Sequence, residues 1–149
     1  MRTRREILDA AAVLAGASLF RLRPARAATQ VEEAIRDRTR GATVEKGRIT
    51  LGVPQIAENG LSVFTTVTVD SPMTQADHVK AIHLFSEKNP VAHIATFRLG
   101  LRAGRAKVST NIRLAASQRV TAIAEMSDGR FFADERSVVV TIAACIDGG

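Results

Sequence analysis

Apolar and polar residues alternate along much of the chain after Gly41, with the period of two that is typical of β-strands. Turn residues separate the alternating segments, notably Asn89-Pro90 and the hairpin dipeptide Asp128-Gly129. No helical pattern intervenes, so about seven short strands at roughly ten-residue spacing predict an all-β fold, an immunoglobulin-like antiparallel β-sandwich. The clearest strand candidates are residues 63–69, 80–85, 94–99, 108–114, 120–126 and 138–142.

Residues 29–39 instead follow a helical pattern, with Val31, Ala34 and Ile35 on one face. Thr29 and Glu32 have the spacing of a capping box, which favours a helix start at this point. We therefore expect a short N-terminal helix before the sandwich. The chain shows no internal repeat, low-complexity tract or linker, so residues 28–142 are expected to form a single domain.

Residues 1–27 have the pattern of a secretory signal peptide. Arg4-Arg5 precedes a mild apolar run from Ala10 to Phe20, and Ala25-Arg26-Ala27 resembles a small-residue cleavage site. The adjacent arginines resemble a twin-arginine signal, and the apolar run is shorter than the about 20 residues that span a bilayer. We expect cleavage after Ala27 and a soluble periplasmic protein with no membrane partner. An amphipathic N-terminal helix of a cytosolic protein is the alternative.

The formal net charge of +6 depends largely on this leader, which holds six of the 21 Lys and Arg residues. In the rest of the chain, Arg98, Arg102, Arg105 and Lys107 cluster around a turn that contains Gly104. Nucleic-acid binding would favour a basic stripe with interleaved aromatic residues, which is lacking here. We interpret the cluster as a solvated loop that could attract an anion or an acidic partner, and expect no nucleic-acid partner.

No catalytic or metal-binding motif is evident. The three histidines, His78, His83 and His93, form no metal-binding pair, and no second thiol completes a Cys/His site, so we interpret them as structural or surface residues. The neighbouring carboxylates Asp134 and Glu135 are expected at a solvated strand edge. We find no serine elbow, phosphate loop or dinucleotide motif, so no metal or cofactor is expected.

Cys145 stands out because it is the one cysteine of a chain that we expect to enter an oxidising compartment. An unpaired cysteine in a secreted protein suggests a reactive thiol or a bond to another chain, and an inert tail cysteine is the third possibility. The cysteine lies near the C-terminus, beyond the last predicted strand. We expect residues 143–149 to form a flexible C-terminal arm around it, made of Ala143, Ala144, Cys145, Ile146, Asp147, Gly148 and Gly149.

The run from about Ala57 to Ile142 resembles the SoxY family of bacterial sulfur oxidation, and the twin-arginine leader fits the same family. The motifs that carry the resemblance are Ala57-Glu58-Asn59-Gly60, Val69-Asp70-Ser71-Pro72-Met73-Thr74, Asp77, Val79-Lys80, Ile82-His83, Asn89-Pro90, Ala95-Thr96-Phe97, Ile112-Arg113-Leu114-Ala115, Ser117-Gln118, Ala124-Glu125-Met126-Ser127-Asp128-Gly129 and Val140-Thr141-Ile142.

This resemblance implies that Cys145 carries sulfur covalently. In such proteins a c-type cytochrome couples thiosulfate to the cysteine as an S-thiosulfonate, a hydrolase releases sulfate, and a sulfane dehydrogenase oxidises the remaining sulfur. A smaller β-sandwich subunit, SoxZ, holds the carrier in a heterodimer. The resemblance therefore implies a carrier subunit of a multi-enzyme system rather than an enzyme.

The tail departs from the family ending, which is Gly-Gly-Cys-Gly-Gly. Ala143 and Ala144 replace the first two glycines, and Ile146 and Asp147 separate Cys145 from Gly148 and Gly149. Alanine and isoleucine restrict the backbone, and an acidic neighbour disfavours a thiolate. Two alternatives stay open: a binding or assembly module whose cysteine forms an interchain disulfide, and an enzyme with Cys145 as nucleophile.

Overall fold

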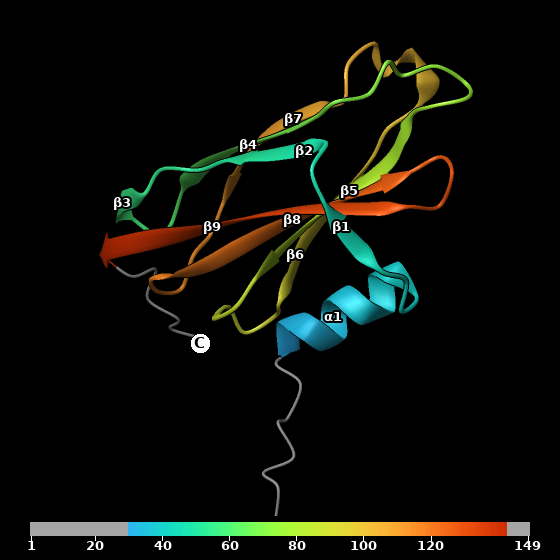
Figure 1. Cartoon of the computed structure of the whole chain (residues 1–149). Coiled ribbons are helices and arrows are strands. Elements are labelled where there is room, and N and C mark those ends of the chain that lie inside the picture. The colour runs from blue at the N-terminus through green and yellow to red at the C-terminus, as the bar shows by residue number, and fades with distance from the viewer. Residues whose placement is uncertain (1–29, 143–149) are drawn as a thin grey trace, which may run out of the picture.

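The computed structural model describes residues 30–142 (Figure 1). The short N-terminal helix that the sequence predicts is present, whereas Thr29 of the expected capping box lies outside the described residues. The elements are α1 (Gln30–Thr39), β1 (Val44–Lys46), β2 (Ile49–Gly52), β3 (Ile56–Asn59), β4 (Val63–Val69), β5 (Val79–Ser86), β6 (His93–Arg98), the 3-10 helix η1 (Leu101–Ala103), β7 (Lys107–Ile112), β8 (Gln118–Met126) and β9 (Phe131–Ile142).

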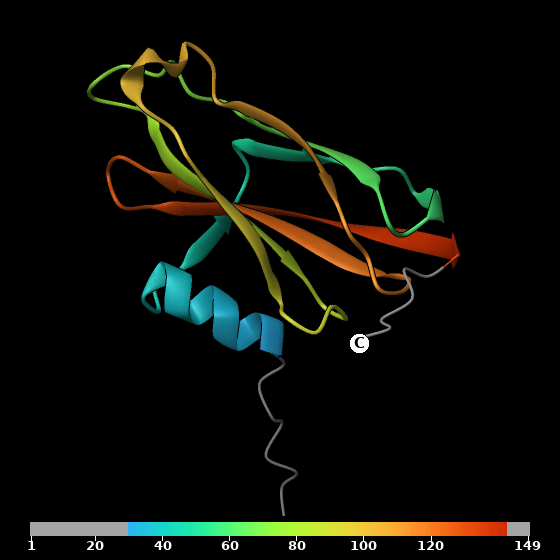
Figure 2. The same cartoon turned by 180° about the vertical axis from the view of Figure 1, so that it is seen from behind.

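The strands form two sheets that face each other, as Figures 1 and 2 show from opposite sides. The larger sheet has the order β1-β9-β8-β5-β6, with β3 also paired to β9, and the smaller sheet has the order β2-β4-β7. This arrangement confirms the predicted sandwich. Every predicted strand is present, although β9 begins at Phe131, earlier than its alternation suggested.

Two features differ from the sequence-based prediction. The strands β1, β2 and β3, all before Val63, were not predicted, because each has only three or four residues and too little alternation to show a period. In addition, β1 and β3 pair with β9 in the parallel direction, whereas the other strand pairs among the described residues are antiparallel. Parallel pairing is possible here because both short strands lie far from β9 in the chain.

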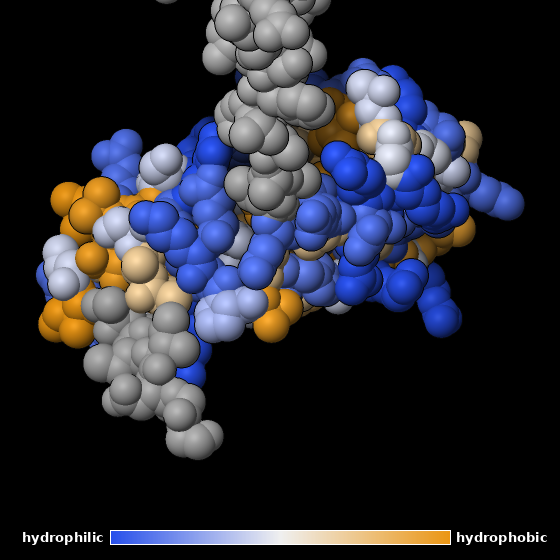
Figure 3. All heavy atoms as spheres, turned by 90° about the horizontal axis from the view of Figure 1, so that it is seen from below, coloured by the Kyte–Doolittle hydropathy of each residue, from blue (hydrophilic) through white to orange (hydrophobic). Residues whose placement is uncertain are grey.

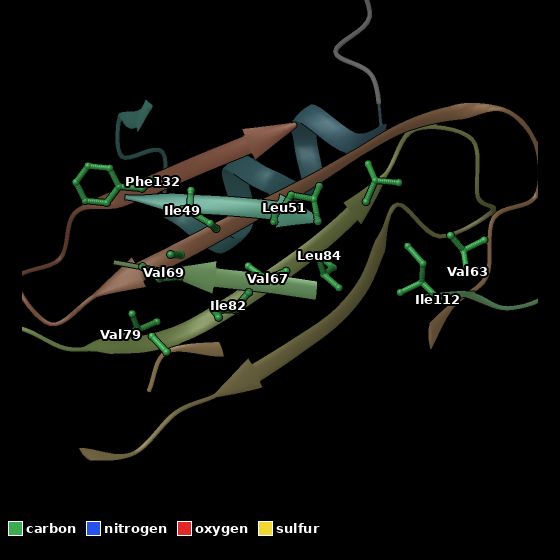
Figure 4. Packing of buried hydrophobic residues seen from close by; sticks show 14 of the residues in the cluster. Ile49, Leu51, Val63, Val67, Val69, Val79, Ile82, Leu84, Ile112 and Phe132 are labelled. Carbon is green, nitrogen blue, oxygen red and sulfur yellow. The ribbon is translucent and has the colours of Figure 1, made fainter. Parts of the chain in front are cut away.

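The main core lies between the two sheets and consists of aliphatic side chains. Ile82 and Leu84 of β5 point toward Leu51 of β2 and Val67 of β4 (Figure 4). Alternate residues of β8, from Val120 to Met126, join the same cluster, as their period of two predicted. Aliphatic residues thus fill the space between the sheets, in keeping with the low aromatic content of the chain.

A second, smaller cluster lies under α1, on the outer face of the larger sheet (Figures 1 and 2). Val31 of the helix packs there with Phe85, Ile123 and Phe131. Strands β5 and β8 are therefore covered on both faces, which explains why their residues are buried almost without interruption. The helix makes the outer face of this sheet a protected surface, on which polar side chains also become buried.

The predicted Asp128-Gly129 turn joins β8 to β9. Gly129 has a φ of 85°, a left-handed conformation that glycine adopts without strain, and its N–H donates to the carbonyl of Met126 over 3.1 Å. The turn places Glu125 opposite Phe131. It thereby sets the register of the whole hairpin, which extends as far as the pair Gln118 and Val138.

Replacing Leu84 with alanine should lower the free energy of unfolding by about 2–5 kcal/mol, because the fully buried side chain leaves a cavity between the sheets. Urea denaturation monitored by circular dichroism would measure the change. The matched control is Val91→Ala, which truncates a side chain that is 70% exposed and should shift stability by no more than about 0.5 kcal/mol. Equal denaturation midpoints for the two variants would contradict this placement of the core.

Candidate functional site

The candidate site is the segment that follows β9, and the structure shows how the root of that segment is held. The N–H of Gly60 donates to the carbonyl of Ile142 over 2.9 Å, and the Thr141 hydroxyl donates to the carbonyl of Glu58 over 2.9 Å. The N–H of Val140 donates to the Ser117 hydroxyl, also over 2.9 Å. These bonds fix the end of β9 three residues before Cys145.

The predicted sulfur-attachment residue Cys145 lies outside the described residues. The same is true of the six other residues that were predicted to form the arm, Ala143, Ala144, Ile146, Asp147, Gly148 and Gly149. Their roles therefore stay predictions, and so does the signal peptide over residues 1–27.

Strand β9 changes neighbours near this end. It pairs with β8 as far as Val138, and from Val139 to Ile142 it pairs with β3. The other edge of β9 pairs first with β1 and later with β3. Between these two pairings, the Asp134 carboxylate accepts the N–H of Leu51 in β2 over 2.8 Å. The strand that leads to Cys145 is thus bonded to the domain from its first residue to its last.

The neighbouring carboxylates Asp134 and Glu135 differ in their surroundings. Glu135 is exposed and pairs with Arg119 over 3.4 Å, as expected for a solvated edge. Asp134 is different, because its side chain is only 18% exposed and bonds to both Leu51 and Arg136. Each of the two carboxylates therefore has a structural partner among the described residues.

The structure brings together residues that the sequence did not connect, on the outer face of the larger sheet beside α1. The Thr96 hydroxyl oxygen lies 2.8 Å from His83 Nδ1 and 2.8 Å from His93 Nε2. The Arg38 guanidinium lies 3.4 Å from His93 Nδ1, and Glu125 lies 3.9 Å from His83 Nε2. These residues come from the helix and three different strands, so their spacing in the chain carries no signal of the cluster.

The contacts set a direction for the hydrogen bonds. A guanidinium only donates, so His93 Nδ1 accepts from Arg38, and His93 Nε2 carries the proton and donates to Thr96. The Thr96 hydroxyl can donate its one proton to His83 Nδ1, and the single ring proton of a neutral His83 then lies on Nε2, toward Glu125. In this arrangement of hydrogen bonds both imidazoles are neutral.

The electrostatic environment favours the same state. Burial lowers the pKa of His83, an effect that Glu125 opposes and that Arg38, His93 and Arg98 reinforce. Burial also lowers the pKa of His93, together with the nearby charge of Arg38. Glu125 is itself bonded to Lys80 over 3.1 Å and lies 3.5 Å from Arg40, so its charge is already compensated without a protonated histidine.

Three further features of the described residues concern metal binding, the basic cluster and the membrane. Among residues 30–142, no three His, Cys, Asp or Glu side chains are grouped so that they could hold a metal ion. The predicted basic cluster of Arg98, Arg102, Arg105 and Lys107 is exposed, as expected for a solvated loop. Within the same residues the structure holds no helix with the length and apolar character that crossing a membrane requires.

The fold and the position of the lone cysteine define a class: a small β-sandwich protein whose last strand leads into a cysteine-bearing segment. A family model described as "Sulfur oxidation protein SoxY" matches residues 20–145, which is most of the chain and ends at Cys145. The chain belongs to the SoxY family of sulfur carrier proteins, and this membership implies a partnership with SoxZ in sulfur oxidation. A search of the curated proteins found no match.

Solved structures share the fold. The sulfur carrier protein SoxY from Chlorobium limicola f thiosulfatophilum has a TM-score of 0.64 and 24% identity, over 76% of this chain and 93% of that one. A superoxide reductase from Ignicoccus hospitalis has a TM-score of 0.56 and 17% identity, over 70% and 91%. A superoxide reductase from Nanoarchaeum equitans has a TM-score of 0.53 and 14% identity, over 64% and 100%. At these identities the likeness concerns the fold alone.

We expect the stability of the domain to fall as the pH drops below the ordinary histidine pKa of about 6.5. Because the folded state lowers the pKa of His83 and of His93, the unfolded state binds protons that the folded state does not, and unfolding becomes easier. The measurement is urea denaturation at about pH 7.5 and about pH 5.5.

The double variant His83→Gln/His93→Gln retains hydrogen-bonding groups but cannot titrate, so its loss of stability between the two pH values should be smaller than that of the unmodified protein. An identical loss in both proteins would show that these histidines do not couple to folding.

Proposed function

We propose that this SoxY-family chain is a periplasmic carrier subunit that holds thiosulfate-derived sulfur covalently on Cys145 and presents it to partner enzymes. The main observation behind the proposal is that the family match extends to residue 145, which is the one cysteine of the chain. The firm attachment of β9 supports it, because a carrier needs a fixed root for the segment that bears its cargo.

The proposal assigns three parts to the chain. Residues 1–27 are a twin-arginine signal peptide, residues 28–142 are the SoxY-like sandwich, and residues 143–149 are the arm that bears the cysteine. The Arg4-Arg5 pair and the following apolar run support export, and a twin-arginine route suits a subunit that leaves the cytoplasm folded and bound to a SoxZ-like partner.

The chemistry begins with the thiolate of Cys145, which is the nucleophilic form of the group. Thiosulfate and the thiolate form a sulfur–sulfur bond and give the S-thiosulfonate, while two electrons pass to a c-type cytochrome partner. A hydrolase then adds water, releases sulfate and two protons, and leaves a persulfide on Cys145. A sulfane dehydrogenase partner can oxidise the remaining sulfur. A covalent tether keeps the intermediate at high effective concentration for each enzyme in turn.

Incubating the complex of this chain and its SoxZ-like partner with thiosulfate and the oxidised cytochrome partner should add the mass of S₂O₃ to Cys145, reversibly on reduction. Intact-protein mass spectrometry and peptide mapping measure the product, and Cys145→Ser is the matched control that should stay unmodified.

Other outcomes would contradict the carrier role. A doubled mass that reduction abolishes, without an adduct, would identify an assembly module with an interchain disulfide, an alternative that the departure of the tail from the family ending favours. Turnover of a thiol-reactive substrate without partners would identify an enzyme that uses Cys145 as nucleophile.

The tail residues offer a second test. Replacing Ala143, Ala144 and Ile146 with glycine should speed the loading of Cys145 by partner enzymes from a system with the usual family ending, because glycine permits more backbone conformations. The initial rate of adduct formation at fixed enzyme concentration measures the effect. A triple substitution to serine at the same positions is the control for side-chain size, and equal rates in all three proteins would show that backbone freedom of the tail is irrelevant.

A further inference from the structure

Helix α1 covers part of the outer face of the larger sheet, and it does so with few buried residues. Figure 3 looks onto this side of the molecule, where most of the visible surface is hydrophilic. Val31 and Thr39, near the two ends of the helix, are its buried residues. A cavity of about 700 Å³ is lined by Ile35 of the helix together with Ile123 and Ala133 of the sheet. The packing of the helix on the sheet is therefore incomplete on this side.

The core between the two sheets does not depend on the helix. None of the side chains in that cluster comes from residues 30–39. The helix packs instead on the second cluster, where Val31 lies with Phe85, Ile123 and Phe131. The helix can therefore leave the sheet while the strands keep their pairing and the main core stays intact.

The last turn of the helix is held by polar contacts that depend on neutral histidines. The Arg38 guanidinium lies 3.4 Å from His93 Nδ1, which accepts a hydrogen bond only while that nitrogen carries no proton. Arg40, directly after the helix, lies 3.5 Å from the Glu125 carboxylate. Glu125 also lies 3.9 Å from His83, so its attraction for Arg40 is strongest while His83 is neutral.

A proton on either histidine weakens these contacts. A protonated His93 has hydrogens on both ring nitrogens, so it no longer accepts from Arg38 and repels that guanidinium. The buried Nε2 of His83 has no hydrogen-bond partner among the described residues, and Glu125 is its nearby carboxylate. A positive charge on His83 therefore competes with Arg40 for Glu125 and loosens the same end of the helix.

The surroundings of the two histidines set the direction of the pH response. Burial lowers the pKa of both, and Arg38 adds to this effect at each of them, while Glu125 opposes it at His83. Because docking of the helix contributes to that burial, a histidine binds its proton more tightly once the helix has left. A fall in pH below the ordinary histidine pKa of about 6.5 therefore favours release. The charged groups around the pair are Arg38 and Arg40 at the end of α1, Lys80 of β5, Arg98 of β6 and Glu125 of β8.

We infer that α1 is an acid-released cover: when His83 and His93 take up protons, the helix leaves the larger sheet and uncovers apolar residues such as Phe85 and Ile123. The sandwich stays folded during this change, because its main core lies between the sheets. The domain thus has an apolar face that is covered at neutral pH and exposed in acid. This inference does not depend on the proposed carrier function.

Hydrogen–deuterium exchange of the full chain at about pH 7.5 and about pH 5.5 tests the inference, with mass spectrometry of peptides from α1 and from β8. Conversion of the rates to protection factors removes the direct effect of pH on exchange. The double variant His83→Gln/His93→Gln retains hydrogen-bonding groups but cannot titrate. The matched control is His78→Gln in the connection between β4 and β5, where His78 Nδ1 lies 3.0 Å from the carbonyl oxygen of Thr74.

A second variant tests the contact from the side of the helix. In Arg38→Gln the amide can donate to a neutral His93 or accept from a protonated one, so the variant should lose less protection in acid than the unmodified protein. Its matched control is Arg36→Gln, which removes an exposed arginine of the same turn.

In the unmodified protein, the protection factors of α1 should fall by about tenfold or more between the two pH values, because a difference of one pKa unit corresponds to a factor of ten. Those of β8 should change by less than about threefold. The controls His78→Gln and Arg36→Gln should keep the fall in α1, and the double variant should abolish most of it. Unchanged protection of α1 in the unmodified protein would overturn the inference. A parallel loss in α1 and β8 would also overturn it, since acid would then unfold the whole domain, and so would a full response in the double variant.

Discussion

The hydrogen bonding of β9 along both of its edges is the constraint on which the rest of the structure depends. Strand β8 pairs with one edge, and β1 and β3 pair with the other, with Asp134 bridging the gap between them. Because alternate side chains of β9 also enter the core, the strand cannot shift its register by one residue without exposing that core. The last strand therefore holds the end of the described domain, at Ile142, in a fixed place.

A second consequence of this arrangement is a buried polar cluster beside the helix. The packing of α1 on the outer face of the larger sheet removes His83 and Glu125 from water. Polar groups without partners would be costly in such a buried position. Thr96 supplies the hydroxyl that two histidines share, and Lys80 compensates the carboxylate. The cluster ties the fold to the protonation state of its histidines. Superoxide reductases share this sandwich, so the fold by itself does not define a function.

The sequence alone determined most of the architecture. Alternation of apolar and polar residues located the strands from Val63 onward, and Asp128-Gly129 located the hairpin between β8 and β9, because both signals are local and depend only on strand geometry. The family was also apparent from motifs that run from Ala57 to Ile142, and the family model confirms it. Strands as short as β1 and β3 escaped detection, since three or four residues are too few to establish a period.

The tertiary structure alone decided what lies together in space. His83, Thr96 and His93 lie in contact because β5 pairs with β6, and the spacing of these residues in the chain does not predict that contact. Likewise, Ile56 and Val139 lie side by side only because β3 pairs with β9 in the parallel direction. Local patterns determine which strands form, whereas contacts between distant strands depend on register and packing, and these are fixed only when the whole chain folds.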